Sequence, residues 1–164
     1  MKTIAFIGAG NMGGALARAA CRAIDPKEVV IYEPNAAAAA ALAEETGCIA
    51  AASGAEAVRA AKYVMLCVKP QVMPGVLNGL IPALKDGIAA GEHRVLVSIA
   101  AGVQLATLAG ILAAGGVELP TVRIMPNTPA SIGEGVLLMA PDAAVTDEDY
   151  SGLPVALRCS GLLE

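Results

Sequence analysis

The fold of this chain is decided by a glycine-rich stretch near its N-terminus, Gly8-Ala9-Gly10-Asn11-Met12-Gly13. A short apolar run, Lys2–Ile7, precedes the stretch, and a helical pattern over residues 11–24 follows it. A second apolar run, Val29–Tyr32, completes a strand–helix–strand unit. The spacing G-x-G-x-x-G between a strand and a helix predicts a dinucleotide-binding site.

Each glycine of this stretch has a physical role in such a site. Gly8 permits a tight turn, Gly10 lets the backbone approach a pyrophosphate, and Gly13 lets the helix pack closely on the strand. The helix N-terminus adds N–H donors and a positive dipole end. A triphosphate-binding loop is excluded, because Gly14-Ala15 stands where that motif requires Lys and Ser or Thr. We therefore predict that the cofactor contacts Gly8, Ala9, Gly10, Asn11, Met12 and Gly13.

An acidic residue follows the second apolar run at the spacing that the motif requires. Glu33 stands twenty residues after Gly13, where a carboxylate would accept hydrogen bonds from the adenosine ribose of NAD. No Arg follows to receive a 2′-phosphate, and a carboxylate would repel one, so the sequence favours NADH over NADPH. We also predict that Asn35 contacts the cofactor. The alternative is that Glu33 is a surface residue before the turn at Pro34-Asn35.

Apolar runs and helical patterns continue to alternate along the chain. Further strands are predicted at residues 49–51, 63–68, 94–99, 122–125 and 136–139, and helices at 36–45, 53–62, 71–84 and 104–114. Another helix is predicted to begin at Thr146, where carboxylates favour a helix start. Pro82 is expected to kink or end its helix, and Pro154 to interrupt the last one. The alternation predicts an α/β fold of the Rossmann type, a doubly wound, mostly parallel sheet.

Composition is consistent with this fold class and excludes several functions. The chain has 164 residues, enough for one domain, of which 16% are charged and 2% aromatic, with a net charge of -4. No Lys/Arg cluster marks a nucleic-acid binder. Residues 95–117 carry no charge, but Ser98, Gln104, Thr107 and four glycines divide them into a strand, a turn and a helix rather than a membrane span.

Outside the glycine stretch, the cysteines, the single histidine and Lys69-Pro70 are the other candidates for a metal, catalytic or binding site. The four cysteines lack metal-ligand spacing, so we predict no metal site, and with no secretory leader pattern the expected location is a reducing cytoplasm. His93, the only histidine, lies in a polar approach to a strand and is expected to be a solvated loop residue rather than a catalytic acid. Lys69-Pro70 is placed at the carboxyl edge of the sheet, where such folds bind ligands, although a simple strand-ending turn is an equal alternative.

Four motifs taken together resemble pyrroline-5-carboxylate reductase, the last enzyme of proline biosynthesis. They are the glycine stretch at 8–13, Val68-Lys69-Pro70-Gln71, Ser98-Ile99-Ala100-Ala101-Gly102 and Arg123-Ile124-Met125-Pro126-Asn127-Thr128-Pro129. The resemblance covers essentially the whole chain, which corresponds to the family's N-terminal dinucleotide-binding domain. It implies that residues 1–164 form that domain. The C-terminal helical domain, which forms the homo-oligomer and completes the substrate pocket, would be absent.

The resemblance also implies roles for residues outside the glycine stretch. Val68, Lys69 and Pro70 would contact the ribose on the nicotinamide side, Ala100 and Ala101 would flank that end of NAD(P)H, and Asn127 would lie near the reaction site. The implied reaction is hydride transfer to the imine carbon of 1-pyrroline-5-carboxylate, giving L-proline. No catalytic residue is assigned, and the chain alone is expected to be nearly inactive.

The sequence departs from the family at two positions that concern the cofactor. Glu33 stands where many relatives have a small hydroxyl residue, and Gly54 where some have a polar residue near the 2′-phosphate. Both departures favour NADH. Two other functions remain open: a related imine or deazaflavin-linked reductase domain, and a stand-alone dinucleotide-binding module without catalysis. The loop at residues 126–129 favours pyrroline-5-carboxylate reductase over the related reductases, and the absent helical domain favours the binding module.

Overall fold

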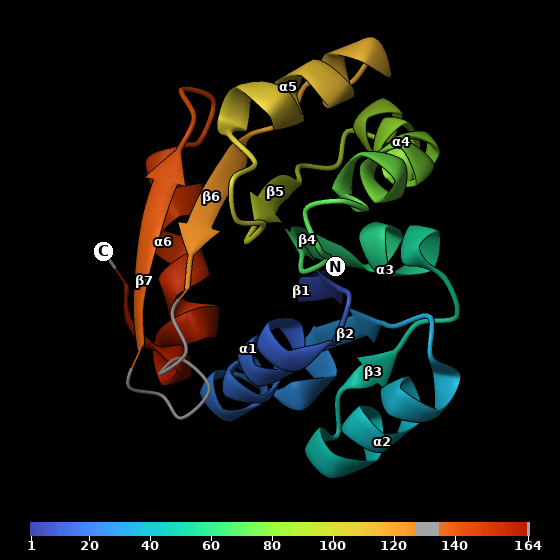
Figure 1. Cartoon of the computed structure of the whole chain (residues 1–164), viewed down its shortest axis with the longest axis vertical. Helices are drawn as coiled ribbons and strands as arrows, with labels where there is room; N and C mark the ends of the chain where they lie inside the picture. The colour runs from blue at the N-terminus through green and yellow to red at the C-terminus, as the bar shows by residue number, and fades with distance from the viewer. Residues whose placement is uncertain (127–134, 164) are drawn as a thin grey trace.

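A computed structural model describes residues 1–126 and 135–163 of the chain. Within them, one twisted sheet is covered on both faces by helices (Figure 1). Eight strands lie in the order β3-β2-β1-β4-β5-β6-β7-β8. This is the predicted doubly wound α/β architecture.

Most neighbouring strands of the sheet are parallel. The pairs from β3 across to β6 are all parallel, β6 and β7 are antiparallel, and β7 and β8 are parallel again. The strands are β1 (Lys2–Ile7), β2 (Val29–Tyr32), β3 (Ile49–Ala50), β4 (Ala61–Leu66), β5 (Val95–Ser98), β6 (Thr121–Met125), β7 (Gly135–Pro141) and β8 (Gly161–Leu163). The first seven correspond to the strands predicted from sequence, and β8 was not predicted.

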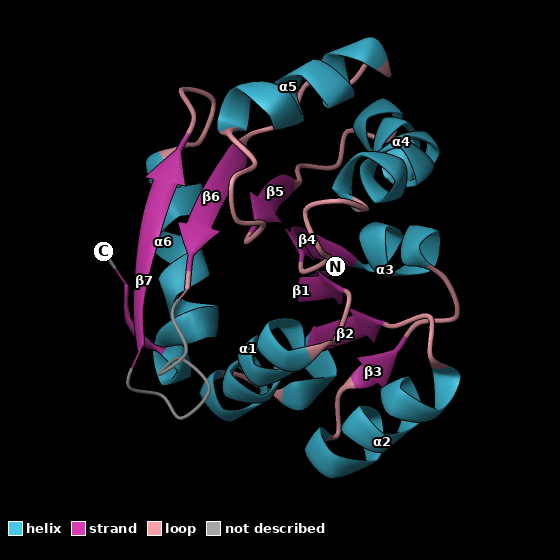
Figure 2. Cartoon of the chain, in the orientation of Figure 1, coloured by secondary structure: helices cyan, strands magenta, loops and turns pink. Residues whose placement is uncertain are grey.

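The helices divide between the two faces of the sheet (Figure 2). Apolar side chains of α1 (Asn11–Ala23), α2 (Ala36–Thr46) and α6 (Asp147–Leu157) form one core with one face of the strands. Those of α3 (Gly54–Ala60), α4 (Met73–Ala89) and α5 (Leu105–Ala114) form a second core on the other face. Two short 3-10 turns, η1 (Pro26–Glu28) and η3 (Arg158–Ser160), complete the described elements. Because strands buried on both faces need continuous apolar sequence, the low charge of the chain follows from this arrangement.

Neither of the two prolines expected to disturb a helix ends it. The helix α4 continues past Pro82 to Ala89, and α6 continues past Pro154 to Leu157. Pro82 is exposed, so the carbonyl that loses its helical partner can be hydrated, while the adjacent Ile81 and Ala83 remain buried. In α6 the buried Leu153, Ala156 and Leu157 hold the helix against the sheet. Tertiary packing therefore outweighs the local cost of each proline.

Other differences from the sequence prediction are small. The strand predicted at 63–68 is β4 at Ala61–Leu66, so Cys67 and Val68 already belong to the following loop. The strand predicted at 94–99 is shorter, Val95–Ser98, and Arg94 is buried and donates to the backbone carbonyls of Val58 and Arg59 at the end of α3. No helix among the described residues is long and apolar enough to cross a membrane.

Candidate functional site

A pocket of about 400 Å³ lies where the loops after β1, β4 and β5 meet. These strands are neighbours and parallel, so their carboxyl ends share one edge of the sheet. The chain order changes direction between β1 and β4, which is where open α/β sheets bind ligands. The pocket is lined by Gly10, Asn11, Met12, Gly13, Cys67, Val68, Lys69, Pro70, Ile99, Ala100, Ala101 and Pro126.

The glycines of residues 8–13 have the geometry that the motif predicts. Gly8 has a φ of 94°, in the region that favours glycine, and forms the turn out of β1. A Cβ atom on Gly13 would lie 2.5 Å from the carbonyl oxygen of Gly8, so only glycine lets α1 approach the strand this closely. A Cβ atom on Gly10 would meet nothing within 4 Å. The space beside Gly10 is therefore open to a ligand.

The N-terminus of α1 faces this pocket without a capping group. Gly10 is its N-cap, and within the described residues no side chain caps the helix and its first turn has no acidic residue. The backbone N–H groups at this end and the positive dipole are thus available to an anion. Together with the open space beside Gly10, these features fit the pyrophosphate of a dinucleotide.

Glu33 is held against the glycine loop by hydrogen bonds to its carboxylate. The backbone N–H of Ala9 donates to Glu33 Oε2 at 2.9 Å, and that of Asn35 donates to Oε1 at 3.2 Å. The backbone N–H of Gly8 donates to the carbonyl of Tyr32 at 2.8 Å. These bonds join the end of β2 to the loop after β1 and fix the direction of the carboxylate.

A second, smaller pocket of about 270 Å³ adjoins Glu33. It is lined by Tyr32, Glu33, Pro34, Ala36, Ala39, Ala40, Ala50, Ala51 and Ala52. Asn35 does not line it; its side-chain oxygen accepts a hydrogen bond from the N–H of Ala38 at 3.1 Å and caps α2. Asn35 therefore has a structural role that the sequence prediction did not include.

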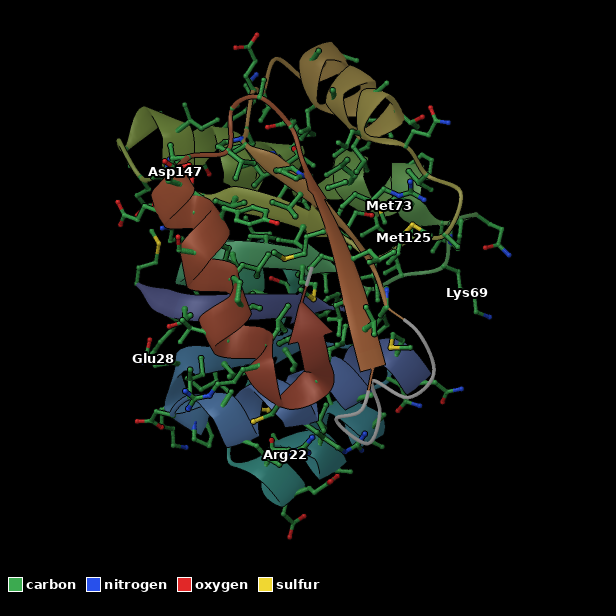
Figure 3. All side chains as sticks on the ribbon, turned by 90° about the vertical axis from the view of Figure 1, so that its left-hand side faces the viewer. Arg22, Glu28, Lys69, Met73, Met125 and Asp147 are labelled. Atoms are coloured by element: carbon green, nitrogen blue, oxygen red, sulfur yellow. The ribbon has the colours of Figure 1, made fainter. Side chains whose placement is uncertain are left out.

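The loops after β4 and β5 form the other side of the main pocket. Lys69 is exposed and its side chain projects away from the ribbon, where it is accessible to a ligand (Figure 3). The N–H of Ala100 donates to Oγ of the buried Ser98 at 3.3 Å, which shapes the turn that carries Ala100 and Ala101. Asn127 lies outside the described residues, although its neighbour Pro126 lines the pocket.

Three residues that line the pocket, Cys67, Ile99 and Pro126, were not among the predicted site residues. Cys67 and Ile99 directly precede Val68 and Ala100, so their position after a strand was the available signal. Burial raises the pKa of the Cys67 thiol well above its ordinary value. The thiol is therefore neutral at physiological pH and acts as part of the wall rather than as a nucleophile.

His93 does not belong to this pocket. Its Nε2 lies 2.9 Å from both carboxylate oxygens of Asp149, and Lys62 Nζ lies 3.2 Å from Oδ1. The His93 side chain is 52% exposed, which agrees with the expected loop position, but its pairing with a buried aspartate was not predicted. This cluster lies where β4 and β5 begin, at the edge of the sheet opposite the pocket.

A somewhat larger cavity, about 480 Å³, lies between α5 and the start of β6. Its walls are mainly apolar, formed by residues such as Leu112, Val117 and Leu119. It contains no residue of the glycine loop and none of the loops after β4 and β5. The pocket of about 400 Å³ at the carboxyl edge is thus the better candidate for a nucleotide site.

Comparisons with known proteins agree with this geometry. Residues 3–102 match the family model described as NADP oxidoreductase, coenzyme F420-dependent. The chain is 37% identical over 165 residues to the pyrroline-5-carboxylate reductase of Escherichia coli (strain K12), covering 99% of this chain and 58% of that protein. The chain thus spans little more than half the length of that relative.

Solved structures show the same likeness. The pyrroline carboxylate reductase of Plasmodium falciparum, solved with NADP bound, superposes with a TM-score of 0.81 at 26% identity, over 99% of this chain and 56% of that one. A variant imine reductase of Myxococcus stipitatus, in complex with NAD+, gives a TM-score of 0.70 at 25% identity over 100% of this chain and 55% of that one. The chain belongs to the family of NADP oxidoreductases, coenzyme F420-dependent, and resembles the N-terminal part of pyrroline-5-carboxylate reductases.

Proposed function

We propose that residues 1–164 form the dinucleotide-binding domain of an NAD(P)H-dependent reductase that converts 1-pyrroline-5-carboxylate to L-proline. The observation that carries this proposal is the pocket at the carboxyl edge of the sheet, where the glycine loop, an uncapped helix N-terminus and the loops after β4 and β5 meet. The names of the similar enzymes supply the substrate, and the NADP in the Plasmodium falciparum enzyme supports the cofactor class.

In this proposal each part of the pocket holds one part of the cofactor. The backbone of Gly8–Gly13 binds the pyrophosphate, Val68, Lys69 and Pro70 contact the ribose on the nicotinamide side, and Ala100 and Ala101 flank the nicotinamide. Asn127 is proposed to lie near the reacting atoms. The cofactor, when bound, supplies a hydride to the imine carbon, so the protein's task is to orient two molecules and exclude water.

We further propose that Glu33 makes the chain prefer NADH. Its two oxygens are each held by a backbone N–H, so the carboxylate cannot easily turn away from an adenosine ribose placed beside it. A ribose hydroxyl can donate to the carboxylate, whereas a 2′-phosphate would be repelled by it. The neighbours include both an NADP and an NAD+ complex, so fold alone does not choose between them.

Titrating NADH and NADPH against the wild type, Glu33→Ser and Glu33→Gln tests this preference. We expect the wild type to bind NADH severalfold more tightly, and Glu33→Ser to tighten NADPH binding. Glu33→Gln keeps the size of the side chain and removes the charge, so it separates repulsion from shape. A wild type that prefers NADPH severalfold would show that the role given to Glu33 is wrong.

The wild-type chain used in these titrations also tests the proposal that residues 1–164 are the dinucleotide-binding domain of a reductase. We expect the 164-residue chain to bind dinucleotide weakly and to reduce pyrroline-5-carboxylate negligibly, because the resemblance implies a C-terminal domain, outside these residues, that completes the substrate pocket and forms the homo-oligomer. Calorimetric titration and an assay of NADH oxidation measure the two properties separately. Full turnover would contradict the incomplete pocket, and the absence of binding to either dinucleotide would contradict the site itself.

A deazaflavin-linked reductase is the second candidate, because the matched family model names coenzyme F420. An imine reductase acting on another substrate is supported by the Myxococcus stipitatus neighbour. Competition between reduced F420 and NADH for the chain tests the deazaflavin-linked reductase, since reduced F420 would displace bound NADH at low concentration only if the site binds a deazaflavin.

A cytoplasmic location remains a prediction from the cysteine content.

A further inference from the structure

The helix α5 has an exposed face without a charged side chain. Its buried residues, Leu108 and Leu112, pack into the core. Its exposed residues are all small: Ala106, Thr107, Ala109, Gly110, Ala113 and Ala114. A helix at the surface of a globular protein ordinarily carries charged residues on the face that meets water. The exposed face of α5 is therefore suited to close packing against another protein surface.

The apolar cavity of about 480 Å³ lies directly beside this helix, at the start of β6 (Figure 1). Leu112 and Val117, which are 2% and 1% exposed, form its buried wall. Two carboxylates also line the cavity, and neither Glu118 nor Asp142 is in an ion pair within the described part of the chain. The backbone N–H of Thr121 donates to Asp142 Oδ2 at 3.0 Å and fixes that carboxylate. The cavity is therefore suited to an apolar group that lies next to a cation.

The outward side of β6 and β7 continues from this cavity toward the carboxyl edge of the sheet. Ile124 packs into the core with α6, so its neighbours Arg123 and Met125 face the other way. In the antiparallel register Arg123 is opposite Ala140, and Met125 is opposite Leu138. Met125 and α6 lie on opposite sides of β7 in Figure 3. Two large apolar side chains, Met125 and Leu138, thus stand about half exposed at the far end of this side.

Arg123 is a cation without a partner in the middle of this side. It is partly buried, and its Nε atom is buried with no hydrogen-bond partner among residues 1–126 and 135–163. In the same residues its guanidinium is in no ion pair. A buried donor without an acceptor lowers stability, and an acceptor from a second molecule would remove that cost.

We propose that α5, the cavity beside it and the outward side of β6 and β7 form an interface between two copies of this chain. The contact is two-fold, so each surface meets the same surface running in the opposite direction. Met125 and Leu138 of one copy enter the cavity of the other. Arg123 of one copy pairs with the carboxylates of Glu118 and Asp142 on the other. The proposal is independent of the cofactor and substrate proposed above.

The order of features along this side favours a second copy over an unrelated partner. The unpaired carboxylates lie at the amino end of β6, and Arg123 lies farther along the strand. Reversal of the second copy therefore brings opposite charges together at two symmetric places. The apolar side chains and the apolar cavity also lie at opposite ends, so the same reversal joins them. Ala140, between the two ends, is small and permits close approach of the strands.

Sedimentation equilibrium of the 164-residue chain tests the interface. We expect a monomer–dimer equilibrium with a Kd on the order of 10 µM, so that the chain is monomeric well below about 1 µM, where the stability of a single copy is measured. Leu138→Glu should weaken association roughly tenfold or more, because it brings a charge into the apolar cavity. Val155→Glu is the matched control, since Val155 is 54% exposed but lies on α6, and it should associate like the wild type. A wild-type chain that is monomeric at about 300 µM would overturn the proposal.

Exchanging the charges tests the two-fold geometry. Arg123→Glu and Glu118→Lys should each weaken association roughly tenfold or more, because like charges then meet at two places. An equimolar mixture of these two variants should associate like the wild type, since each residue 123 then meets an opposite charge at residue 118. Circular dichroism and thermal melting check that each variant is folded. If Arg123→Glu does not fold, Ala113→Glu at the exposed cavity wall replaces it as the disrupting variant and should also weaken association. A mixture that associates no better than either variant alone, or unchanged association of Ala113→Glu, would show that this surface is not the interface.

Discussion

Two glycines of the same motif, Gly13 and Gly10, differ in whether the folded protein has room for a side chain. A methyl group on Gly13 would lie 2.5 Å from the Gly8 carbonyl oxygen and 2.8 Å from Cys67 Cβ, whereas one on Gly10 would meet nothing within 4 Å. Gly13 is thus required by the fold. Gly10 has room for a side chain in the protein itself, so its requirement comes from the proposed ligand.

Substituting each glycine by alanine should separate folding from binding. We expect Gly13→Ala to lower the free energy of unfolding by about 1–3 kcal/mol through overpacking. Gly10→Ala should change it by less than about 0.5 kcal/mol, yet weaken dinucleotide binding by roughly tenfold or more, because its methyl group would occupy the space intended for the pyrophosphate. Urea unfolding and NADH titration measure the two effects. Unchanged NADH affinity in Gly10→Ala would place the pyrophosphate elsewhere.

The helix α6 is held in place at its N-terminus by a buried carboxylate. Asp149 is 1% exposed and forms a capping box with Thr146, while His93 and Lys62 pair with its carboxylate. Tyr63 donates to its backbone carbonyl at 2.9 Å. Burial raises the pKa of Asp149, but the hydrogen bonds from His93, Thr146 and Lys62 lower it by more, so the net pKa lies below its ordinary value.

This balance predicts acid-sensitive stabilisation. A pKa that is lower in the folded than in the unfolded state gives stability that is fully present above the ordinary Asp value of about 3.9 and is lost as pH falls through the folded value. Asp149→Asn should therefore lower the free energy of unfolding by about 1–3 kcal/mol at pH 7, with a smaller loss near pH 3. Urea unfolding at the two pH values measures it.

A control lies in the same helical turn. Asp147 is exposed and lies at the start of α6 (Figure 3), so Asp147→Asn should cost only a few tenths of a kcal/mol through the helix dipole. Equal losses for the two variants would mean that the buried pairing of Asp149 contributes nothing.

At the scale of the whole molecule, the last strands of the sheet have a buried side and, among the described residues, an exposed side. The core side of β6 and β7 packs against α6, and Leu137 is completely buried there. On the opposite side Met125 and Leu138 are neighbours in the antiparallel register and are 52% and 49% exposed. Successive residues of β7 therefore experience different environments.

Alanine substitution of Leu137 and of Leu138 should reveal the difference between the buried and the exposed side of β7. We expect Leu137→Ala to lower the free energy of unfolding by about 2–4 kcal/mol, because it leaves a cavity beneath α6. Leu138→Ala should cost less than about 1 kcal/mol, since half of its side chain is already in water. Chemical denaturation of both variants measures the difference, and comparable losses would show that the outer face is covered in solution.

Much of the fold and of the candidate site could be predicted because the relevant patterns are local. The glycine spacing, the apolar runs and the cap at Thr146 each concern residues close together in the chain, and the structure has a strand, a turn or a helix at each. Parallel strands separated by helices bring their carboxyl ends to one edge, so Lys69 and Pro70 could be placed near the glycine stretch in advance, whereas Ala100 and Ala101 were expected there only from the family resemblance.

The order of elements, the fold class and the edge of the sheet that holds the candidate site follow from patterns along the chain. Long-range packing sets what those patterns do not show: α4 and α6 run through their prolines, β7 is antiparallel to β6, and Glu33 is tied to Ala9. It also pairs Asp149 with His93. The reason is that burial and hydrogen bonds between distant segments can outweigh local preferences, and the pattern along the chain does not show which distant segments meet.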